Sequence, residues 1–165
     1  MSNSPYTVLF LCTGNSARSI LAEYITRQYF SEKFNAFSAG SHPKEAPNPV
    51  ALQILHEEFQ IDCSDAHSKS WDQFLGQKID FVITLCDDAK ESCPVWPGQP
   101  VMAHWGMKDP SDVPEAEKPR AFLRTAQVLK YRMELLSNLP IAKLDRLKLE
   151  QETRDIRNAH PGEAS

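Results

Sequence analysis

The chain lacks long apolar runs and any excess of positive charge. None of its hydrophobic stretches approaches the roughly 20 residues that cross a bilayer. The opening residues Met-Ser-Asn-Ser-Pro lack the charged and apolar regions of a signal peptide. The formal net charge is −4, and no basic stripe is present to neutralise nucleic-acid phosphates. We therefore expect a cytoplasmic protein with no membrane partner and no nucleic-acid partner.

Cysteine is also scarce, with four residues at positions 12, 63, 86 and 93. Without an export signal, these residues do not fit a structural disulfide framework, and reactive or buried thiols are expected instead. Cys63 has no partner at a useful spacing and is expected to be inert. The 165 residues, 41% hydrophobic and 24% charged, allow one sizeable core, so a single globular domain is predicted.

Strand-like and helix-like segments alternate along the chain. Strands are predicted at 6–11, 34–39, 81–85 and within 98–105, and helices at 18–30, 49–59, 70–74 and 119–137. This alternation predicts an α/β fold whose parallel sheet is covered on both faces. We place the domain at residues 1–139 and a charged C-terminal helix (141–157) and tail at 140–165, without deciding whether that tail docks.

Residues 12–19, Cys-Thr-Gly-Asn-Ser-Ala-Arg-Ser, lie where the first strand is expected to turn into a helix. Backbone N–H groups and the positive end of the helix would converge there on a tetrahedral oxyanion, and Arg18 can grip the anion with a planar fork of donors. The same field is expected to lower the pKa of Cys12 and make it a thiolate nucleophile. The predicted oxyanion-binding residues are Thr13, Gly14, Asn15, Ser16, Ala17 and Arg18.

Two further thiols follow the third predicted strand. Cys86 is expected at the sheet edge that carries Cys12, and Cys93 follows it after a polar stretch that could form a short helix. A disulfide needs the two Cα atoms within about 7 Å, so pairing of Cys86 with Cys93 should require that stretch to loop out. The spacing predicts a relay in which Cys12 exchanges with Cys86 and Cys86 then exchanges with Cys93.

A third feature is the segment His104-Trp105-Gly106, which is followed by Asp109-Pro110. Asp109 can lie over the oxyanion cradle and act as general acid for the departing oxygen. An Asp-Pro pair is also common turn chemistry. His104 and Trp105 are interpreted as packing and loop-positioning residues.

Together these segments resemble the arsenate reductases that are built on the low-molecular-weight tyrosine phosphatase fold. The resemblance spans residues 6 to about 136, and its motifs are the Cys12–Ser19 loop, Ser38-Ala39-Gly40, His67-Ser68-Lys69-Ser70, Cys86…Cys93-Pro94 and His104-Trp105-Gly106…Asp109-Pro110. It implies a three-layer sandwich around a central four-stranded parallel sheet. It also implies arsenate as the substrate.

The resemblance implies a role for each residue of the first chemical step. Cys12 would attack arsenate to give a covalent thiol–arsenate adduct, and Arg18 and the loop amides would bind its oxygens. Asp109 would protonate the departing hydroxyl. Ser19 would hydrogen-bond and stabilise the Cys12 thiolate. Many relatives carry a cysteine where this chain has Ala17, but that cysteine is not needed in the relay.

The later steps implied by the resemblance are exchanges between thiols. Cys86 would attack the Cys12 sulfur, release arsenite and leave a Cys12–Cys86 disulfide. Cys93 would then form a Cys86–Cys93 disulfide at the surface. Related reductases use thioredoxin, or glutathione with glutaredoxin, or other small thiols as the electron donor. The intact cysteine pair favours thioredoxin, because the enzyme can make its own exportable disulfide.

No metal and no cofactor are expected. Some relatives bind potassium beside the loop through Asn, Glu, Ser and Asp side chains, of which the first three match Asn15, Glu23 and Ser38. The position of the Asp is taken by Ser70, next to Lys69. The Lys69 ammonium could replace the cation, so a potassium requirement is not expected.

Two other functions use the same residues. A phosphotyrosine phosphatase would need the same nucleophile, arginine and acid, but that branch usually follows its catalytic Asp-Pro with tyrosine, where this chain has Ser111. A non-catalytic oxyanion or redox sensor would need an effector surface, for which only the tail 140–165 is available.

Overall fold

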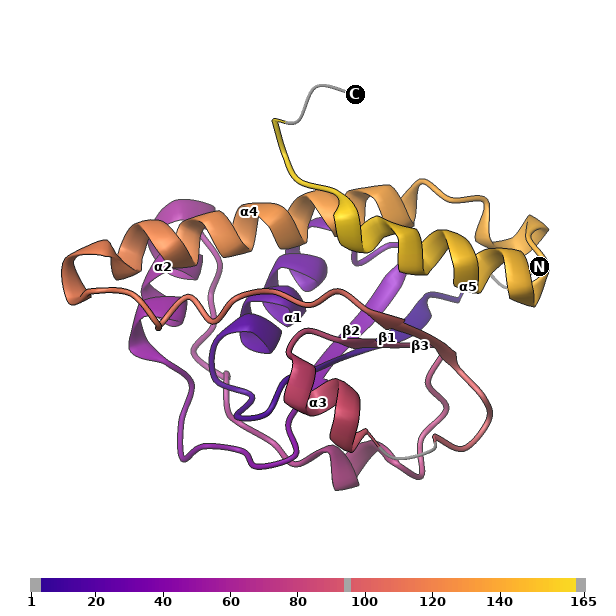
Figure 1. Ribbon diagram of the computed structural model, residues 1–165, viewed down its shortest axis with the longest axis horizontal. Coiled ribbons are helices and arrows are strands. Elements are labelled where there is room, and N and C mark those ends of the chain that lie inside the picture. Colours follow the sequence, from indigo (N-terminus) through magenta and orange to yellow (C-terminus); the bar gives the residue numbers. More distant parts are fainter. Residues whose placement is uncertain (1–3, 94–95, 163–165) are drawn as a thin grey trace.

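A four-stranded parallel sheet organises the chain. The computed structural model describes residues 4–93 and 96–162, without the side chains of residues 88, 91 and 92. Its strands are β1 (Tyr6–Leu11), β2 (Phe34–Ala39), β3 (Phe81–Thr84) and β4 (Val101–His104). They are arranged in the order β2-β1-β3-β4, and all three pairings are parallel (Figure 1). The α/β fold predicted from the sequence is confirmed.

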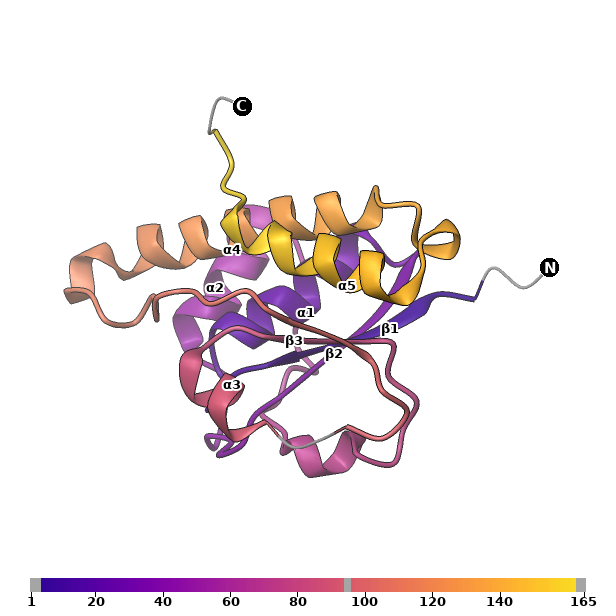
Figure 2. The same cartoon turned by 45° about the vertical axis from the view of Figure 1, so that its right-hand side comes forward.

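Helical layers cover both faces of the sheet. One face carries α1 (Arg18–Tyr29), α2 (Pro49–Phe59), α4 (Lys118–Ser137) and α5 (Arg146–Asp155), as Figure 2 shows. The other carries α3 (Asp87–Ser92) and the 3₁₀ turn η1 (Trp71–Phe74). Shorter 3₁₀ turns are η2 (Glu115–Glu117), η3 (Ile141–Lys143) and η4 (Ile156–Asn158). No helix in the described part of the chain is long and apolar enough to span a membrane.

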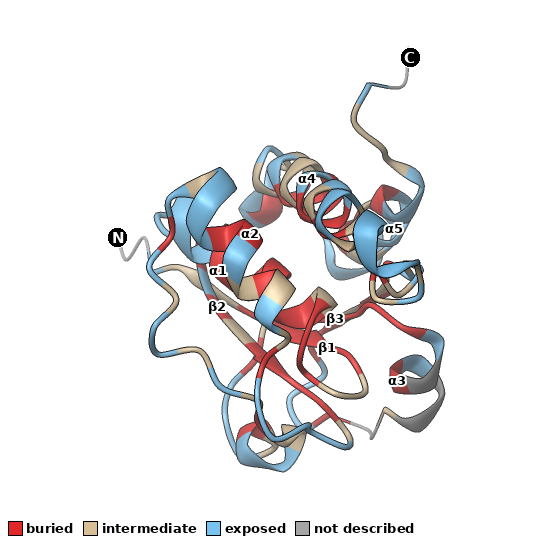
Figure 3. Cartoon of the chain, turned by 90° about the vertical axis from the view of Figure 1, so that its left-hand side faces the viewer, coloured by how far each residue is buried: buried red, intermediate tan, exposed pale blue. Residues whose placement is uncertain are grey.

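Strand β1 is buried on both faces, which explains its continuous apolar run. Val8 and Phe10 belong to the larger core beneath α1 and α4, whereas Leu9 and Leu11 belong to the smaller core beneath η1 and α3. Figure 3 shows this buried centre between the helical layers. Central parallel strands are covered on both sides and so lose the alternation of apolar and polar residues. The carboxyl end of β1 is thereby fixed rigidly where the 12–17 loop begins.

The expected helix over residues 141–157 is wrong as a single element. The segment forms η3, then an extended Leu144, and only then α5 and η4. The side chain of Asp145 accepts a hydrogen bond from the N–H of Lys148 at 2.8 Å and so starts a new helix. The other boundaries that we predicted differ little from those of the structure.

The C-terminal segment docks on the domain, a point that the sequence left open. Leu149 and Ile156 are buried in the larger core. The Trp105 indole N–H donates to the carbonyl of Thr153 at 2.9 Å, and the buried Arg132 guanidinium donates to the carbonyl of Ala159 at 3.1 Å. Helix α5 is therefore held over β4 by apolar contacts and by hydrogen bonds.

Gly40 is required where β2 leaves the sheet. A Cβ atom there would lie 2.4 Å from the carbonyl oxygen of Thr13 and 2.6 Å from that of Cys12. We expect Gly40→Ala to lower the free energy of unfolding by about 3 kcal/mol, because the backbone of the cradle would have to move. Urea denaturation measures this. Gly76→Ala is the control, since its Cβ would meet nothing within 4 Å. Equal stability of the two variants would contradict the prediction.

Candidate active site

The loop between β1 and α1 surrounds a cavity of about 460 Å³ at the carboxyl edge of the sheet. This is the edge at which ligands bind in open α/β sheets. Its lining includes eight residues that the sequence singled out, namely Cys12, Thr13, Gly14, Ser16, Ala17, Arg18, Cys86 and Asp109. Asn15, Ser19 and Cys93 are outside the lining. The cradle, the acid and the second thiol thus meet in one place.

Arg18, the first residue of α1, is held at the cavity, and its Nε–H group has no partner among the described atoms. Its Nη1 donates to the carbonyl of Met107 at 2.9 Å, and its Nη2 lies 3.7 Å from Oδ2 of Asp109. Its Nε is buried and has no hydrogen-bond partner among the described atoms. A buried N–H without a partner is rare in folded proteins. We interpret this guanidinium as a preformed fork for an oxyanion.

Cys12 and Cys86 line the same cavity, and each thiol alters the pKa of the other. The Cys86 sulfur also accepts the N–H of Thr13 at 3.3 Å and lies 3.2 Å from the Thr13 hydroxyl. The cradle thus holds the second thiol of the predicted relay in contact with the first. Cys86 follows β3 by two residues, at the same sheet edge as Cys12, as the sequence indicated.

The expected lowering of the Cys12 pKa is wrong for this arrangement of the site. The hydrogen bond to Cys86 and burial raise the pKa of the Cys12 thiol, against the opposing charge of Arg18. The same bond from Cys12, with help from Thr13, lowers the pKa of Cys86 to about 5. The two thiols therefore ionise as a coupled pair, and their interaction favours the thiolate at Cys86 over the thiolate at Cys12. A thiolate was expected at Cys12 because the sequence shows the oxyanion loop but not the Cys86 thiol that lies beside it in the fold.

Asp109 is held as a carboxylate. Burial raises its pKa, but hydrogen bonds from Ser111 and the charges of Arg18 and Lys44 outweigh burial and lower the pKa overall. The N–H and the hydroxyl of Ser111 reach Oδ1 of Asp109 at 2.9 and 2.7 Å. Ser111, noted in the sequence only as a departure from the phosphatases, is thus the residue that orients the acid.

Cys93 stands at the far end of α3, which begins just after Cys86. The Trp96 indole nitrogen donates to its sulfur at 3.1 Å, and burial raises the pKa of the thiol. All four cysteines are free. The short helix that the sequence allowed between Cys86 and Cys93 is confirmed, so a disulfide between them would have to form after α3 unwinds.

A buried polar network supports the cradle from behind. Asn15 has a φ of 45°, and its side chain donates to the Ser19 hydroxyl at 2.8 Å and accepts the N–H of Lys69 at 2.8 Å. The side chain of Asn15 therefore supports the loop, and its place among the oxyanion-binding residues stays a prediction. No hydrogen bond joins Ser19 to Cys12 among the described side chains, so the role of Ser19 as a thiolate donor stays a prediction.

The residues that would hold potassium in relatives do not fit a cation here. Glu23 is buried and already has two cationic partners, Arg27 at 2.5 Å and Lys69 at 3.6 Å. It also accepts the hydroxyl of Ser38. Ser70 instead caps the 3₁₀ turn η1. The Lys69 ammonium, which also donates to the carbonyl of His67 at 2.8 Å, lies where a cation would be needed.

Lys69→Met is expected to destabilise the protein by about 1–3 kcal/mol, because Glu23 would lose one of two charge partners in a buried site. Thermal unfolding at fixed pH measures this. Lys148→Met, which removes an exposed pair with Glu152, should leave the melting temperature almost unchanged. Exchange of sodium for potassium should not alter wild-type stability or activity. A marked potassium dependence in the wild type would contradict this assignment.

The sequence reading missed one wall of the cavity. The segment 42–48 is bonded to the cradle along its backbone: the N–H groups of His42, Lys44 and Asn48 donate to the carbonyls of Thr13, Gly14 and Ser16 at 2.9, 3.0 and 2.8 Å. The side chain of Lys44 lies across Gly14, and its charge acts on Asp109. In the sequence, Lys44 is simply a lysine in a proline-rich loop. Nothing in that pattern indicates that the loop packs against residues 13–16.

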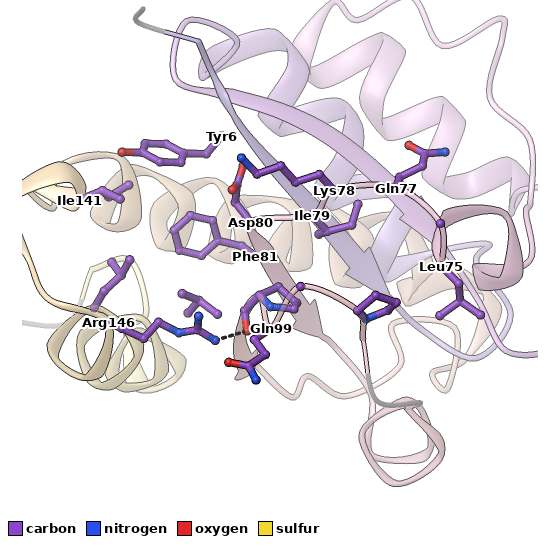
Figure 4. A pocket seen from close by; sticks show the side chains of 16 residues that line it. Tyr6, Leu75, Gln77, Lys78, Ile79, Asp80, Phe81, Gln99, Ile141 and Arg146 are labelled. Carbon is purple, nitrogen blue, oxygen red and sulfur yellow. Dashed lines mark hydrogen bonds between the residues drawn. The ribbon is translucent and has the colours of Figure 1, made fainter.

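A larger cavity, of about 700 Å³, lies at the opposite end of the sheet. In Figure 4 the side chains of Tyr6, Phe81 and Arg146 line it, and Arg146 donates to the carbonyl of Pro100 at 2.9 Å. No cysteine is present among the described residues that line it. The nucleophile and the anion fork belong to the smaller cavity, which we take as the active site.

A thiol nucleophile, an anion fork and an acid around one loop define a class of enzymes in which sulfur attacks a tetrahedral oxyanion. Comparison with known proteins identifies the family: residues 7–148 match the low molecular weight phosphotyrosine protein phosphatases. The chain belongs to this family.

Individual relatives share more than the family fold. An arsenate reductase of Staphylococcus xylosus is 39% identical over 105 residues, which cover 64% of this chain and 79% of the relative. A solved arsenate reductase in the phosphate binding state superposes with a TM-score of 0.68 at 28% identity, covering 80% of this chain and 96% of that one. A thioredoxin-dependent arsenate reductase of Corynebacterium glutamicum gives a TM-score of 0.58 at 25% identity, over 81% of this chain and 63% of that one.

Proposed function

We propose that this protein reduces arsenate to arsenite through Cys12, Cys86 and Cys93 and is recycled by thioredoxin. The observation that carries the proposal is the placement of Cys86 with Cys12 in the lining of the Arg18 cavity, where each thiol alters the pKa of the other. A phosphatase needs water to resolve its cysteine adduct, whereas here a second thiol already touches the first. The names of the relatives support the same chemistry.

The first step joins Cys12 to arsenic. An oxyanion that enters the cavity bonds to the free Nε of Arg18 and to the loop amides, and Thr13 can then turn from Cys86 toward the anion. The proton of Cys12 passes to the departing oxygen by way of Asp109, Cys86 stays a thiolate, and the Cys12 sulfur attacks arsenic. An oxygen leaves as water, with its proton supplied through Asp109. The negative charge of the bound anion beside Asp109 raises the pKa of that carboxyl and allows it to carry the proton.

The second step reduces arsenic. The Cys86 thiolate attacks the Cys12 sulfur, a sulfur–sulfur bond forms, and the sulfur–arsenic bond breaks. The electron pair of that bond stays on arsenic, which leaves as arsenite. Cys93 then attacks the Cys86 sulfur and frees Cys12 as a thiolate. This last exchange needs α3 to unwind, because the helix now separates the two cysteines.

Thioredoxin is the proposed donor because its two thiols can reduce the Cys86–Cys93 disulfide in a single binding event. Glutaredoxin with glutathione is the alternative donor. The similarity to the thioredoxin-dependent arsenate reductase of Corynebacterium glutamicum supports this choice of donor. A reducing compartment such as the cytoplasm fits four free cysteines. Asp109, Arg18 and Cys12 would also serve phosphate-ester hydrolysis, so a low phosphatase activity is compatible with the site.

The proposal is tested by following NADPH oxidation in a mixture of the protein, arsenate, thioredoxin and thioredoxin reductase. Turnover is expected for the wild type and should be lost in Cys93→Ser, which should still release one arsenite per enzyme. Cys63→Ser is the matched control and should retain full turnover. Full thioredoxin-linked turnover of Cys93→Ser would exclude the role given to Cys93. Aryl-phosphate hydrolysis without arsenate-dependent NADPH loss would favour the phosphatase, and absence of both activities would favour a sensor.

A further inference from the structure

A third cavity, of about 590 Å³, lies on the far side of α3 from the proposed arsenate site. Its lining includes Cys93 and three cationic side chains: Lys90 from α3, Arg154 from α5 and Arg157 from η4. No carboxylate is found among the described residues that line it. Figure 3 shows α3 and α5 on the same side of the molecule. A net-acidic protein thus concentrates positive charge around one of its cysteines.

Arg154 is bonded to the sheet and Arg157 to the backbone of α5, so neither is held by the helix that must unwind. Nε of Arg154 donates to the carbonyl of Met102 in β4 at 3.1 Å, and its Nη2 lies 3.2 Å from Glu150. Nη1 of Arg157 donates to the carbonyl of Arg154 at 3.3 Å. Both arginines are exposed. They stay in place when α3 rearranges, so the same positive surface is present before and after the Cys86–Cys93 disulfide forms.

We propose that the surface formed by Lys90, Arg154 and Arg157 around Cys93 docks the protein reductant through carboxylates that flank its reactive cysteine. This inference rests on the proposed relay and adds the site at which electrons enter. The three cationic side chains are exposed and lie on separate elements, so they do not enclose a small ligand. Their arrangement fits a negatively charged protein surface better. Opposite charges on the enzyme and on the reductant would increase the rate at which the two proteins associate and would orient them.

The position of the docking surface fixes which sulfur the reductant attacks. Its thiolate attacks Cys93, a new sulfur–sulfur bond joins the two proteins, and the Cys86–Cys93 bond breaks with its electron pair on Cys86. The second cysteine of the reductant then attacks its own mixed disulfide and releases Cys93 as a thiolate. The reductant leaves as a disulfide, and the enzyme regains both thiols. Attack at Cys93 expels Cys86 as a thiolate. Cys86 is a better leaving group than Cys93, because its sulfur accepts a hydrogen bond from the N–H of Thr13 and its pKa is low.

The test is a charge reversal read out with two reductants. Arg157→Glu, alone and with Arg154→Glu, should raise the KM for thioredoxin at least about tenfold and weaken its salt dependence. The KM for arsenate and the turnover supported by dithiothreitol, a neutral dithiol, should not change. Arg120→Glu with Arg124→Glu, the same charge change on the exposed side of α4, is the matched control. Thermal unfolding checks that each variant is folded.

Each alternative gives a different pattern. An equal rise in KM for the α4 control would overturn the proposal and leave only an effect of net charge. Loss of glutathione-supported turnover with unchanged thioredoxin kinetics would also overturn it, in favour of a small acidic thiol. If the wild type shows no arsenate-dependent turnover with either reductant, the proposed function itself fails and the docking site fails with it.

Discussion

Arg18→Lys is expected to lower kcat/KM for arsenate by at least about a hundredfold. Lysine would keep the positive charge but lose the planar fork, including the buried Nε that has no partner in the described structure. Loss of one preorganised donor to a transition-state oxyanion typically lowers the rate a hundredfold or more. The effect should appear in kcat as well as in KM, because charge on the oxygens grows as sulfur attacks. Steady-state kinetics with saturating thioredoxin measure both constants.

Two controls accompany Arg18→Lys: one tests whether another cation of the cavity matters as much, and the other tests whether the variant is folded. Lys44→Arg keeps a cation on the opposite wall of the cavity and should change kcat/KM by only a few-fold. Arg18→Lys also loses the bond to the Met107 carbonyl, so its urea denaturation should be recorded beside that of the wild type. Wild-type kcat/KM in a folded Arg18→Lys protein would show that charge alone is sufficient, and the fork would lose its assigned role.

Cys12→Ala is expected to raise the pKa of Cys86 from about 5 by more than about one pH unit. The hydrogen bond from Cys12 is the largest cause of the low value, and alanine cannot donate it. In the wild type, thiolate absorbance at short ultraviolet wavelengths should persist on acidification and disappear around pH 5. In Cys12→Ala the loss should occur at higher pH, since only the hydrogen bonds of Thr13 and of the Ala89 backbone then oppose the effect of burial.

Cys63→Ala is the control for this titration. Burial raises the pKa of Cys63, so its removal should leave the acidic transition of the wild type unchanged. Cys86→Ala should remove the transition altogether. If the transition instead persists in Cys86→Ala, the thiolate belongs to Cys12, and the assignment of the shared charge would have to be reversed.

The order of elements could be predicted because it rests on local signals. Strand β1 is a run of strand formers and α2 follows a helical apolar pattern, and both appear in the structure within the predicted bounds, where Asn48 caps α2. The single helix expected over 141–157 failed for a local reason too. Asp145 is a helix-starting residue inside an apparently continuous pattern, and its capping bond was not considered.

The active site could be predicted only in part. Cys12, Arg18 and Asp109 were recognised by motif and now line one cavity. Lys44 and the orienting role of Ser111 escaped notice, because a long loop carries no periodic signal that says what it lies against. Ser19 and Cys93 keep the roles assigned from the sequence as predictions, to be decided by the experiments above.

By itself the sequence determined the parts: a parallel α/β fold, an oxyanion loop at the end of its first strand, and two later cysteines at relay spacing. Tertiary structure alone decided how they are coupled. The pairing of β1 with β3 brings together Cys12 and Cys86, which are 74 positions apart, and their interaction raises the pKa of the first thiol and lowers that of the second. The docking of α5, likewise, places Arg154 and Arg157 beside Cys93. Ionisation depends on what surrounds a group in space, and sequence spacing does not contain that information.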